Sequence, residues 1–537
     1  MVGVRRHPTA RPDPPGARLA DGEGPVQAVH DLEAREVRHA RRVRRPFRLD
    51  EQTRSQAHHP LVRKLGALFA LFAFGLAGCG GTTNPGSGAA DFVPASVPLF
   101  VAIDTDLGSS QWQTVNELAN KFPDKQKAFD SIKQQLTTKG LDWEEDLKPA
   151  LGPELDVVML DLAHPDETVA LMQPKDLGAF EGAVRKGNAA DPSSKLVYEQ
   201  FHGWTVISDK RAAIDAFTQA SDSAKRTLSE NKTFSNAMAK AGDGIFRAYV
   251  DGAQVMAAAR KFGGPDAGAY LEKLGTLDWL LMTLRAKSDG VAWDTTVHGT
   301  PGKAFKNVDV NGSDGSLEKL VPKDALLYLA FHGSKGMLAG LGDNPILQQF
   351  GAKGLDDAFR QLGTILEGEN AFYVRAAGTK DVPDITFIAS PRSGVDGAAV
   401  LDRILTRYAK ELGVRPHRAT IAGVPARVIG ARAGVAVRYA NVKGKLIVTD
   451  LPSGIVFAKR GGKSLTDSQE YKDATSGVPA SPQVVLYVDI HSTIPALRRL
   501  GQIPPDLERN LKPLRSAVEY AVSRSHEFQI SFFLRIK

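Results

Sequence analysis

The chain has 537 residues, 42% of them hydrophobic, a formal net charge of +7 and a single cysteine. Residues 1–61 hold twelve arginines against eight acidic residues, a balance of +4, and Arg63 with Lys64 add +2, so the remaining chain carries about +1 of the total +7. The positive charge is therefore no argument for nucleic-acid binding. The chain is long enough to bury a core over two or more domains without disulfides.

The cysteine ends a segment that is typical of a lipoprotein signal. Two basic residues precede an apolar run over residues 65–75, and Leu76, the small residues Ala77 and Gly78, and Cys79 follow it. Leu76, Ala77 and Gly78 fit a signal peptidase, and the Cys79 thiol accepts a diacylglyceryl group. A second acyl chain, such as palmitate, on the freed amine would make the anchor stable. We expect Cys79 to be the lipid-anchored first mature residue, on the extracytoplasmic face of the cell membrane.

Other interpretations of this region are less favoured. The apolar run is shorter than the roughly 18 to 20 residues of a membrane-spanning helix. A buried helix ending in an inert cysteine is opposed by the Gly-, Ser- and Thr-rich residues 79–92, which predict a flexible tether. The Arg-rich residues 1–61 are either a disordered cytoplasmic arm or an untranslated stretch, and the second interpretation, with a start at Val62 and a signal peptide over 62–78, is preferred.

An internal repeat organises the rest of the chain. Three segments of the first part of the chain have similar counterparts later. The segment from Val93-Pro94 to Ala102 resembles the one from Val321-Pro322 to Ala330, and Thr227 to Phe234 resembles Ser464 to Tyr471. The third pair is Tyr249-Val250-Asp251 and Tyr487-Val488-Asp489. The three pairs are collinear and lie 228, 237 and 238 residues apart. Collinearity favours duplication over chance. The sequence predicts a first lobe over 93–310, a linker over 311–320 and a second lobe over 321–537.

The predicted elements follow from hydrophobic periodicity. In the first lobe, strands are expected at 98–105, 155–162 and 168–173, and helices at 111–122, 124–139 and 175–185. In the second lobe, strands are expected at 371–377, 384–389, 420–429, 435–441 and 445–450, with a helix over 396–412 and a closing strand through Phe528 to Ile536. Their close spacing suits antiparallel hairpins. The predicted class is α+β, with two similar lobes, each a mostly antiparallel sheet with helices on one face.

The lipobox, the opening strand from Val93 and the segment from Asp142 to Gly152 together resemble a bacterial domain-of-unknown-function family. Its members are envelope-associated or lipid-anchored. The second lobe has no clear copy of the Asp142 to Gly152 segment. The resemblance implies location and fold, and it implies no catalytic residue.

Two segments resemble ligand-binding motifs, one for phosphate and one for calcium, but both motifs are incomplete. Gly461-Gly462-Lys463-Ser464 looks like the end of a phosphate-binding loop, but Phe457 stands where the first glycine is needed, so a loop before a capped helix is expected. Residues 309–315 resemble a calcium loop, but Asp314 replaces the turn glycine. A polar linker is the preferred interpretation there.

No nucleophile elbow occurs, and the seven histidines after Cys79 have no metal-ligand spacing; they are His164, His202, His298, His332, His417, His491 and His526. A catalytic or zinc site assembled only in space stays open. The acidic run Asp142, Glu144, Glu145 and Asp146 could pair carboxylates, but a solvated helix start is favoured.

All five tryptophans fall in the first lobe, at Trp112, Trp143, Trp204, Trp279 and Trp293. An aromatic surface for a glycan or lipid would therefore lie there, although core packing is the simpler explanation.

The sequence thus predicts a non-catalytic envelope module with no cofactor and no metal. It would contact the lipid bilayer through acylated Cys79 and bind an unknown protein, glycan or lipid. An envelope hydrolase and an extracytoplasmic lipid carrier are the alternatives.

Overall fold

The structure is a computed structural model. It describes residues 88–537 apart from 263–267, 269–270, 273–274, 303–311, 335–337, 339–355, 377–382, 409–415, 431–435 and 500–502. Cys79 and the residues expected to guide its cleavage, Leu76, Ala77 and Gly78, lie outside the described residues, as do segments 1–61 and 62–78. The expected lipid anchor therefore stays a prediction.

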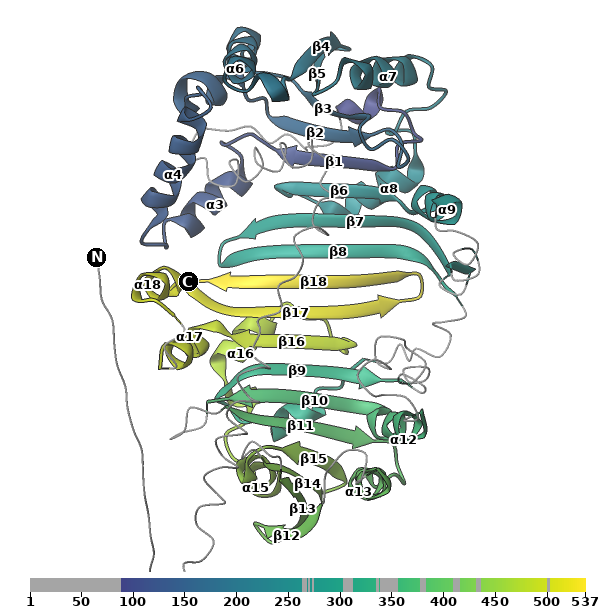
Figure 1. The fold of residues 1–537 in the computed structure, drawn as a ribbon, viewed down its shortest axis with the longest axis vertical. Helices are drawn as coiled ribbons and strands as arrows, with labels where there is room; N and C mark the ends of the chain where they lie inside the picture. The colour runs from purple at the N-terminus through teal and green to yellow at the C-terminus, as the bar shows by residue number, and fades with distance from the viewer. Residues whose placement is uncertain are drawn as a thin grey trace, which may run out of the picture. The chain divides into compact units, whose positions relative to one another are not determined.

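In the first half, residues 93–310, single strands and pairs of consecutive strands are separated by helices (Figure 1). The main elements are β1 (Leu99–Asp104), α3 (Ser110–Ala119), α4 (Lys125–Thr137), β2 (Glu154–Met159), β3 (Thr168–Met172), α6 (Leu177–Ala190), β4 (Val197–Phe201), β5 (Trp204–Ser208), α7 (Arg211–Asp222), α8 (Lys232–Ala241), β6 (Phe246–Asp251), α9 (Gly252–Phe262), β7 (Gly275–Lys287) and β8 (Gly290–Pro301).

The second half, residues 321–537, follows a 3-10 turn over Ser316–Leu320. Its elements are β9 (Ala325–Gly333), α12 (Asp356–Leu366), β10 (Gly368–Arg375), β11 (Asp384–Pro391), α13 (Gly397–Arg407), β12 (His417–Ile421), β13 (Val424–Gly430), β14 (Ala436–Val442), β15 (Lys445–Thr449), α15 (Pro452–Arg460), α16 (Gln469–Thr475), β16 (Val484–Asp489), α17 (Ile490–Arg499), α18 (Pro505–Leu511), β17 (Leu514–Arg524) and β18 (Glu527–Ile536).

All eighteen strands belong to one sheet, and every pairing in it is antiparallel. From one edge to the other the strands run β4-β5-β3-β2-β1-β6-β7-β8-β18-β17-β16-β9-β10-β11-β15-β14-β13-β12. The α+β class and the antiparallel pairing agree with the prediction. The expectation of one sheet in each lobe is wrong, because the last strand of each half pairs with the other.

The pairing of β8 with β18 is the seam between the halves. It runs in register from Gly290 opposite Arg535 to His298 opposite Glu527. Side chains reinforce it at both ends, since Lys121 Nζ donates to the Ile536 carbonyl at 3.0 Å and Lys240 forms an ion pair with Glu527. The seam is thus a long backbone ladder with additional polar ties.

Helices pack on both faces of the sheet, which corrects the expectation of one covered face. On β1, Phe100 and Ala102 join a cluster with α7 and α8, whereas Val101 and Ile103 join a cluster with α3, α4 and α6. Successive strand residues point to opposite faces. Helices also cover both faces in the second half. Ile388 of β11 packs in the cluster of α15 and α16, whereas its neighbours Phe387 and Ala389 pack with α12 and α13. The run Leu99–Ile103 is apolar throughout because it is covered on both faces.

Local sequence explains where many elements begin and turn. Ser109, Asp176 and Asp396 accept hydrogen bonds from backbone N–H groups in the first turns of α3, α6 and α13. The stretch 420–429, expected as one strand, is instead a hairpin of β12 and β13 around Ala422 and Gly423, both with positive φ. An alanine is unusual in that conformation, so the turn left little signal in the sequence.

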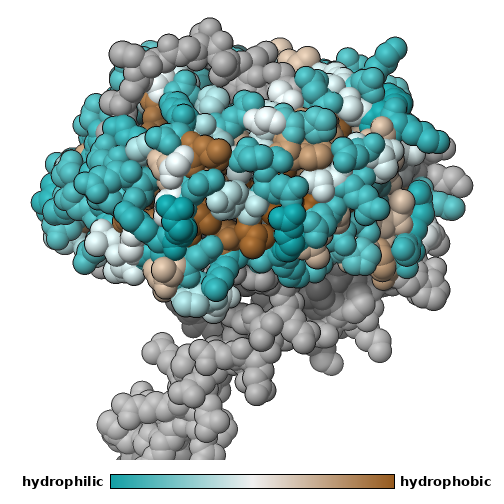
Figure 2. Space-filling view, turned by 90° about the horizontal axis from the view of Figure 1, so that it is seen from above, coloured by the Kyte–Doolittle hydropathy of each residue, from teal (hydrophilic) through white to brown (hydrophobic). Residues whose placement is uncertain are grey.

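The end of the sheet that carries β4 is mainly hydrophilic at its surface. Figure 2 views the molecule from the end where α6, β4 and α7 lie in Figure 1, and it shows the most apolar residues near the middle of a largely hydrophilic surface. The edge strand β4 has an exposed glutamine and no fully buried residue.

The seam predicts that the two halves unfold as one unit. Leu465→Ala removes a side chain with 0% exposure from the second half and should lower the free energy of unfolding by about 2–5 kcal/mol. All tryptophans lie in the first half, so tryptophan fluorescence during urea denaturation reports that half alone. We expect the fluorescence transition of Leu465→Ala to move to lower urea together with the circular dichroism transition.

The matched variant Leu228→Ala makes the same change at a site with 0% exposure in the first half, and it should shift both signals equally. A fluorescence transition that stays in place in Leu465→Ala would mean that the halves unfold independently.

Candidate functional site

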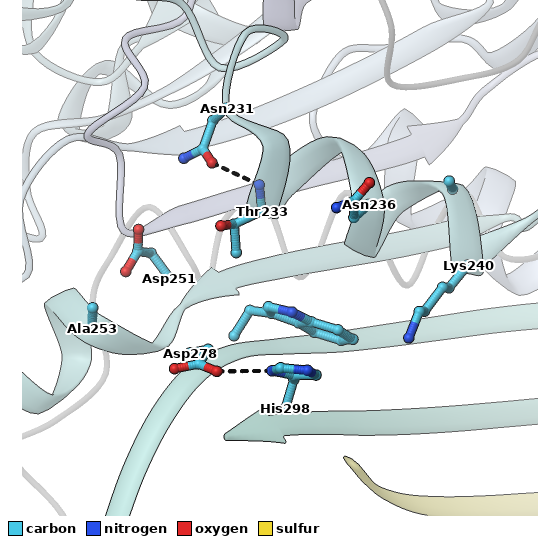
Figure 3. Close-up of a pocket in the computed structure, with 10 residues that line it drawn as sticks. Asn231, Thr233, Asn236, Lys240, Asp251, Ala253, Asp278 and His298 are labelled. Atoms are coloured by element: carbon cyan, nitrogen blue, oxygen red, sulfur yellow. Dashed lines mark hydrogen bonds and ion pairs between the residues drawn. The ribbon is translucent and has the colours of Figure 1, made fainter. Parts of the chain in front are cut away.

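A cavity of about 630 Å³ lies beside the seam, between α8, the start of α9 and the ends of β7 and β8 (Figure 3). Most of its lining is polar. The lining residues are Asn231, Thr233, Asn236, Ala239, Lys240, Asp251, Ala253, Asp278, Trp279 and His298.

His298 is the central titratable group of the cavity. Its Nδ1 lies 2.9 Å from Oδ2 of Asp278, and its ring stacks on Trp279 with centroids 5.2 Å apart and planes at 13°. Figure 3 shows the Asp278 and His298 side chains next to each other, and Lys240 extending from α8 toward the strands. The Lys240 ammonium lies 5.4 Å from the centre of the Trp279 ring and is also paired with Glu527.

Two polar residues of the cavity serve the local fold. Asn231 Oδ1 accepts hydrogen bonds from the backbone N–H groups of Thr233 and Phe234, which caps α8, and Asp251 Oδ1 accepts one from Gln254 at the start of α9. Thr233 supplies the one hydroxyl among the lining residues. The cavity therefore pairs an oriented imidazole with a carboxylate, and its described lining includes no serine or cysteine.

A second polar group is buried on the sheet itself, across β2, β1 and β6. The residues are Asp104, Glu154, Asp156 and Arg247, all 8% exposed or less. Asp156 and Arg247 both face Ala102 in the strand register, from opposite sides, and Glu154 faces Asp104. No described N–H or O–H group donates to either carboxylate oxygen of Asp156.

Burial controls the protonation of this group. It raises the pKa of Asp104 to about 6, although a hydrogen bond from Ser109 acts in the opposite direction. Burial first, and then the neighbouring Glu154 carboxyl, raise the pKa of Asp156 well above its usual range. Burial also lowers the pKa of Arg247. Burial and the neighbouring Glu154 carboxyl therefore both favour the neutral form of the Asp156 carboxyl.

The residues singled out in the sequence are mostly placed in structural roles. Asp142 accepts hydrogen bonds from the Glu144 and Glu145 N–H groups, and Asp146 binds Lys186 at 2.6 Å, a bond that lowers the pKa of Asp146. These contacts form a capped helix start. Ser464 and Asp467 form a capping box after the glycine-rich loop at 461–462. In the calcium-like segment, Asp309 and Asn311 lie outside the described residues, and Asp314 donates its N–H to Glu369.

The histidines do not converge on one site. His298 and His526 approach each other across the seam with ring centres 6.3 Å apart, and His332 contacts Glu369 at 3.3 Å in the second half. Within the described ranges, no three His, Cys, Asp or Glu side chains are placed to hold a metal ion. The partners of His298 could not be inferred from the sequence because Asp278, although only 20 residues away, is brought to it by the pairing of β7 with β8.

Four of the five tryptophans are core residues, since Trp112, Trp143, Trp204 and Trp279 are at most 8% exposed. Trp293 is 36% exposed, on the sheet face opposite the cavity. Of the five tryptophans, Trp293 is thus the one that can contribute to an aromatic surface on the first half. None of the helices that the structure describes has the length and apolar character needed to cross a bilayer.

The buried carboxyls predict an unusual dependence of stability on pH. Because the pKa values of Asp104 and Asp156 are higher in the folded than in the unfolded chain, the folded state binds more protons, and the free energy of unfolding should rise as the pH falls from 7.5 to 5. Asp156→Asn replaces the carboxyl group with an amide of nearly the same shape that does not titrate. It should reduce this rise, measured by urea denaturation at both pH values, by about 1.4 kcal/mol for each pH unit of this window over which the folded chain holds the proton and the unfolded chain does not.

Glu117→Gln, at an exposed position on α3, is the control and should leave the slope unchanged. If Asp156 were instead an anion paired with Arg247, Asp156→Asn would destabilise the chain at pH 7.5.

Comparisons with known proteins give no family. No family model and no curated protein matches the chain. Among solved structures, three crystal forms of a protein named TP0453 align weakly: form I at 12% identity over 41% of this chain and 75% of that one, form IV at 14% over 42% and 81%, and form III at 12% over 41% and 92%. With a TM-score of 0.22 in each case, these similarities assign neither a fold family nor an activity to the chain.

Proposed function

We propose that the chain is a lipid-anchored, extracytoplasmic protein of the cell envelope that binds a partner and catalyses no reaction. The observation that carries this proposal is an apolar strip in the middle of the sheet. Trp293 on β8 and Phe528 and Phe532 on β18 point to the same face and are 36%, 41% and 37% exposed. We call these three residues the central strip. Large apolar side chains gathered on a surface are typical of binding sites.

The sequence around Cys79 supports the location. Acylation there would use the only thiol of the chain, and the described fold begins nine residues later, at Gly88. Ala89 and Ala90 are already buried against the first half. An acylated Cys79 would therefore hold the folded part close to the bilayer through a short Gly- and Ser-rich tether.

We also propose that the halves arose by duplication, and matching contacts support this. Pro94 bridges to Thr227 in the first half, and Pro322 bridges to Ser464 in the second. Asp251 and Asp489 are the last residues of the corresponding strands β6 and β16, and each accepts a hydrogen bond from a backbone N–H three residues later. The order β4-β5-β3-β2-β1-β6-β7-β8 corresponds to β14-β15-β11-β10-β9-β16-β17-β18, with the β12–β13 hairpin as the additional segment.

An envelope hydrolase is the second candidate, and the contact between His298 and Asp278 is the observation that favours it. An imidazole oriented by a carboxylate can act as a general base. Among the described lining residues there is no serine or cysteine, so the base would activate either the Thr233 hydroxyl or a water. The lipid-carrier alternative requires an apolar cavity, whereas the described cavity is lined mainly by polar side chains.

Hydrolysis of p-nitrophenyl acetate separates the first two candidates. We expect wild-type chain and His298→Gln to hydrolyse it at the same slow rate. A large loss of rate in His298→Gln, with a bell-shaped pH profile in the wild type, would instead support the hydrolase.

The anchor is tested by Cys79→Ser. The variant cannot form the thioether, so we expect it to be found in the soluble fraction while the wild type sediments with membranes, and intact mass should show acyl chains only on the wild type. Thr83→Ser, four residues further along the tether, should behave like the wild type. A Cys79→Ser chain that remains membrane-bound would contradict the proposed anchor.

A further inference from the structure

The central strip carries a negative charge at its edge. Phe532 pairs with Trp293 on one side and with Glu519 of β17 on the other. Glu519 pairs in turn with Leu486 of β16, and its neighbours along β17 on the same face are Ala517 and Ala521. Glu519 is exposed, and no described cation is within ion-pair distance of it.

The apolar row extends well beyond the strip. In register across the sheet it runs through Phe246, Leu284, Trp293, Phe532, Glu519, Leu486 and Leu329. The Phe246 and Trp293 rings stack with centres 5.8 Å apart, which holds the tryptophan in place at the surface. Glu519 is thus the one charged residue in a row of seven.

The same face of the sheet is covered by helices on both sides of the strip. Leu118 of α3 packs with Val291 and Leu534, an apolar pair on β8 and β18 next to the strip. In the second half, α12 and α13 pack on Phe387 and Ala389. An added helix would therefore continue the layer that this face already carries. A strand could not add here, because β8 and β18 are already paired on both sides.

We propose that the central strip and Glu519 bind a cationic amphipathic helix of a partner protein. The apolar side of the helix would cover Trp293, Phe528 and Phe532, and a lysine or arginine would pair with Glu519 and lie over the Trp293 or Phe532 ring. From Leu284 to Leu486 the row crosses five strands, about 19 Å at a spacing of about 4.8 Å, which a helix of about 13 residues spans. This inference names the partner of the proposed binding protein and rests on that function.

The lone carboxylate also selects against other apolar occupants. An anionic membrane surface would be repelled by Glu519, and acyl chains would leave it without a partner in an apolar contact. A cationic side chain of the partner would instead form an ion pair with the Glu519 carboxylate.

The test uses two fluorescein-labelled 14-residue helical peptides with leucines on one face, identical except for one central lysine or glutamate. The probe is added to the full chain carrying Cys79→Ser, in buffer without detergent, and binding is followed by anisotropy. We expect the wild-type Glu519 chain to bind the lysine peptide about 5-fold more tightly than the glutamate peptide, and Glu519→Lys to reverse this order. Trp293→Ala should weaken both peptides about tenfold without changing the order.

Glu117→Lys, an exposed charge reversal on α3, is the matched control and should keep the wild-type order. Equal binding of both peptides by the wild type, or binding that survives Trp293→Ala with Phe532→Ala, would overturn the proposal. So would Trp293-dependent binding to phosphatidylglycerol vesicles, which would indicate a membrane surface. Membrane fractionation of the wild type tests the anchor separately, so a failure of peptide binding with the anchor intact overturns this inference alone.

Discussion

The structure depends on one backbone interaction, the antiparallel pairing of β8 with β18. Either half alone would be a sheet of eight or ten strands that ends in a long hairpin. Because the two final strands pair over nine residues, the halves share one sheet and one set of layers. The exposed strip, the cavity beside α8 and the contact between Lys240 and Glu527 all lie at or next to this seam. The candidate sites are thus properties of the fused sheet more than of either half.

Much of the local structure could be predicted from the sequence. The spacing of Trp112, Val115 and Leu118 identified α3, because it comes from burial on one side of the helix. The alternation through Phe528 to Ile536 identified β18 as a strand but not its buried side, since Phe528 and Phe532 are exposed while Ser531 and Arg535 are buried. The partner of β18 could not be predicted, since a half-buried strand pairs equally well within its own half. Strands β7 and β8 escaped prediction because polar and apolar residues mix on both of their faces, with Thr283 and Arg285 beside Leu281.

The candidate sites were harder to foresee than the fold. The sequence pointed to tryptophans in the first half, and burial removes four of them from consideration. It gave no reason to connect Trp293 with Phe532 or Glu519, which are more than 220 residues further along the chain and meet Trp293 only through the seam. The buried Asp156 also lacked a signal, because an aspartate in an apolar strand pattern is ordinarily read as a solvent-facing position. Long-range pairing decides both sites.

The seam also changes how many open strand edges the molecule has. Two separate sheets would have four edges, and two of them would be β8 and β18, of 12 and 10 residues with apolar side chains. Long edge strands of this kind invite pairing with other chains and aggregation. Joining them leaves β4 and β12 as the edges of the described sheet, five residues each, with Glu199 next to Arg211 at one edge and Arg418 at the other. The seam therefore removes two long strand edges at which other chains could otherwise pair.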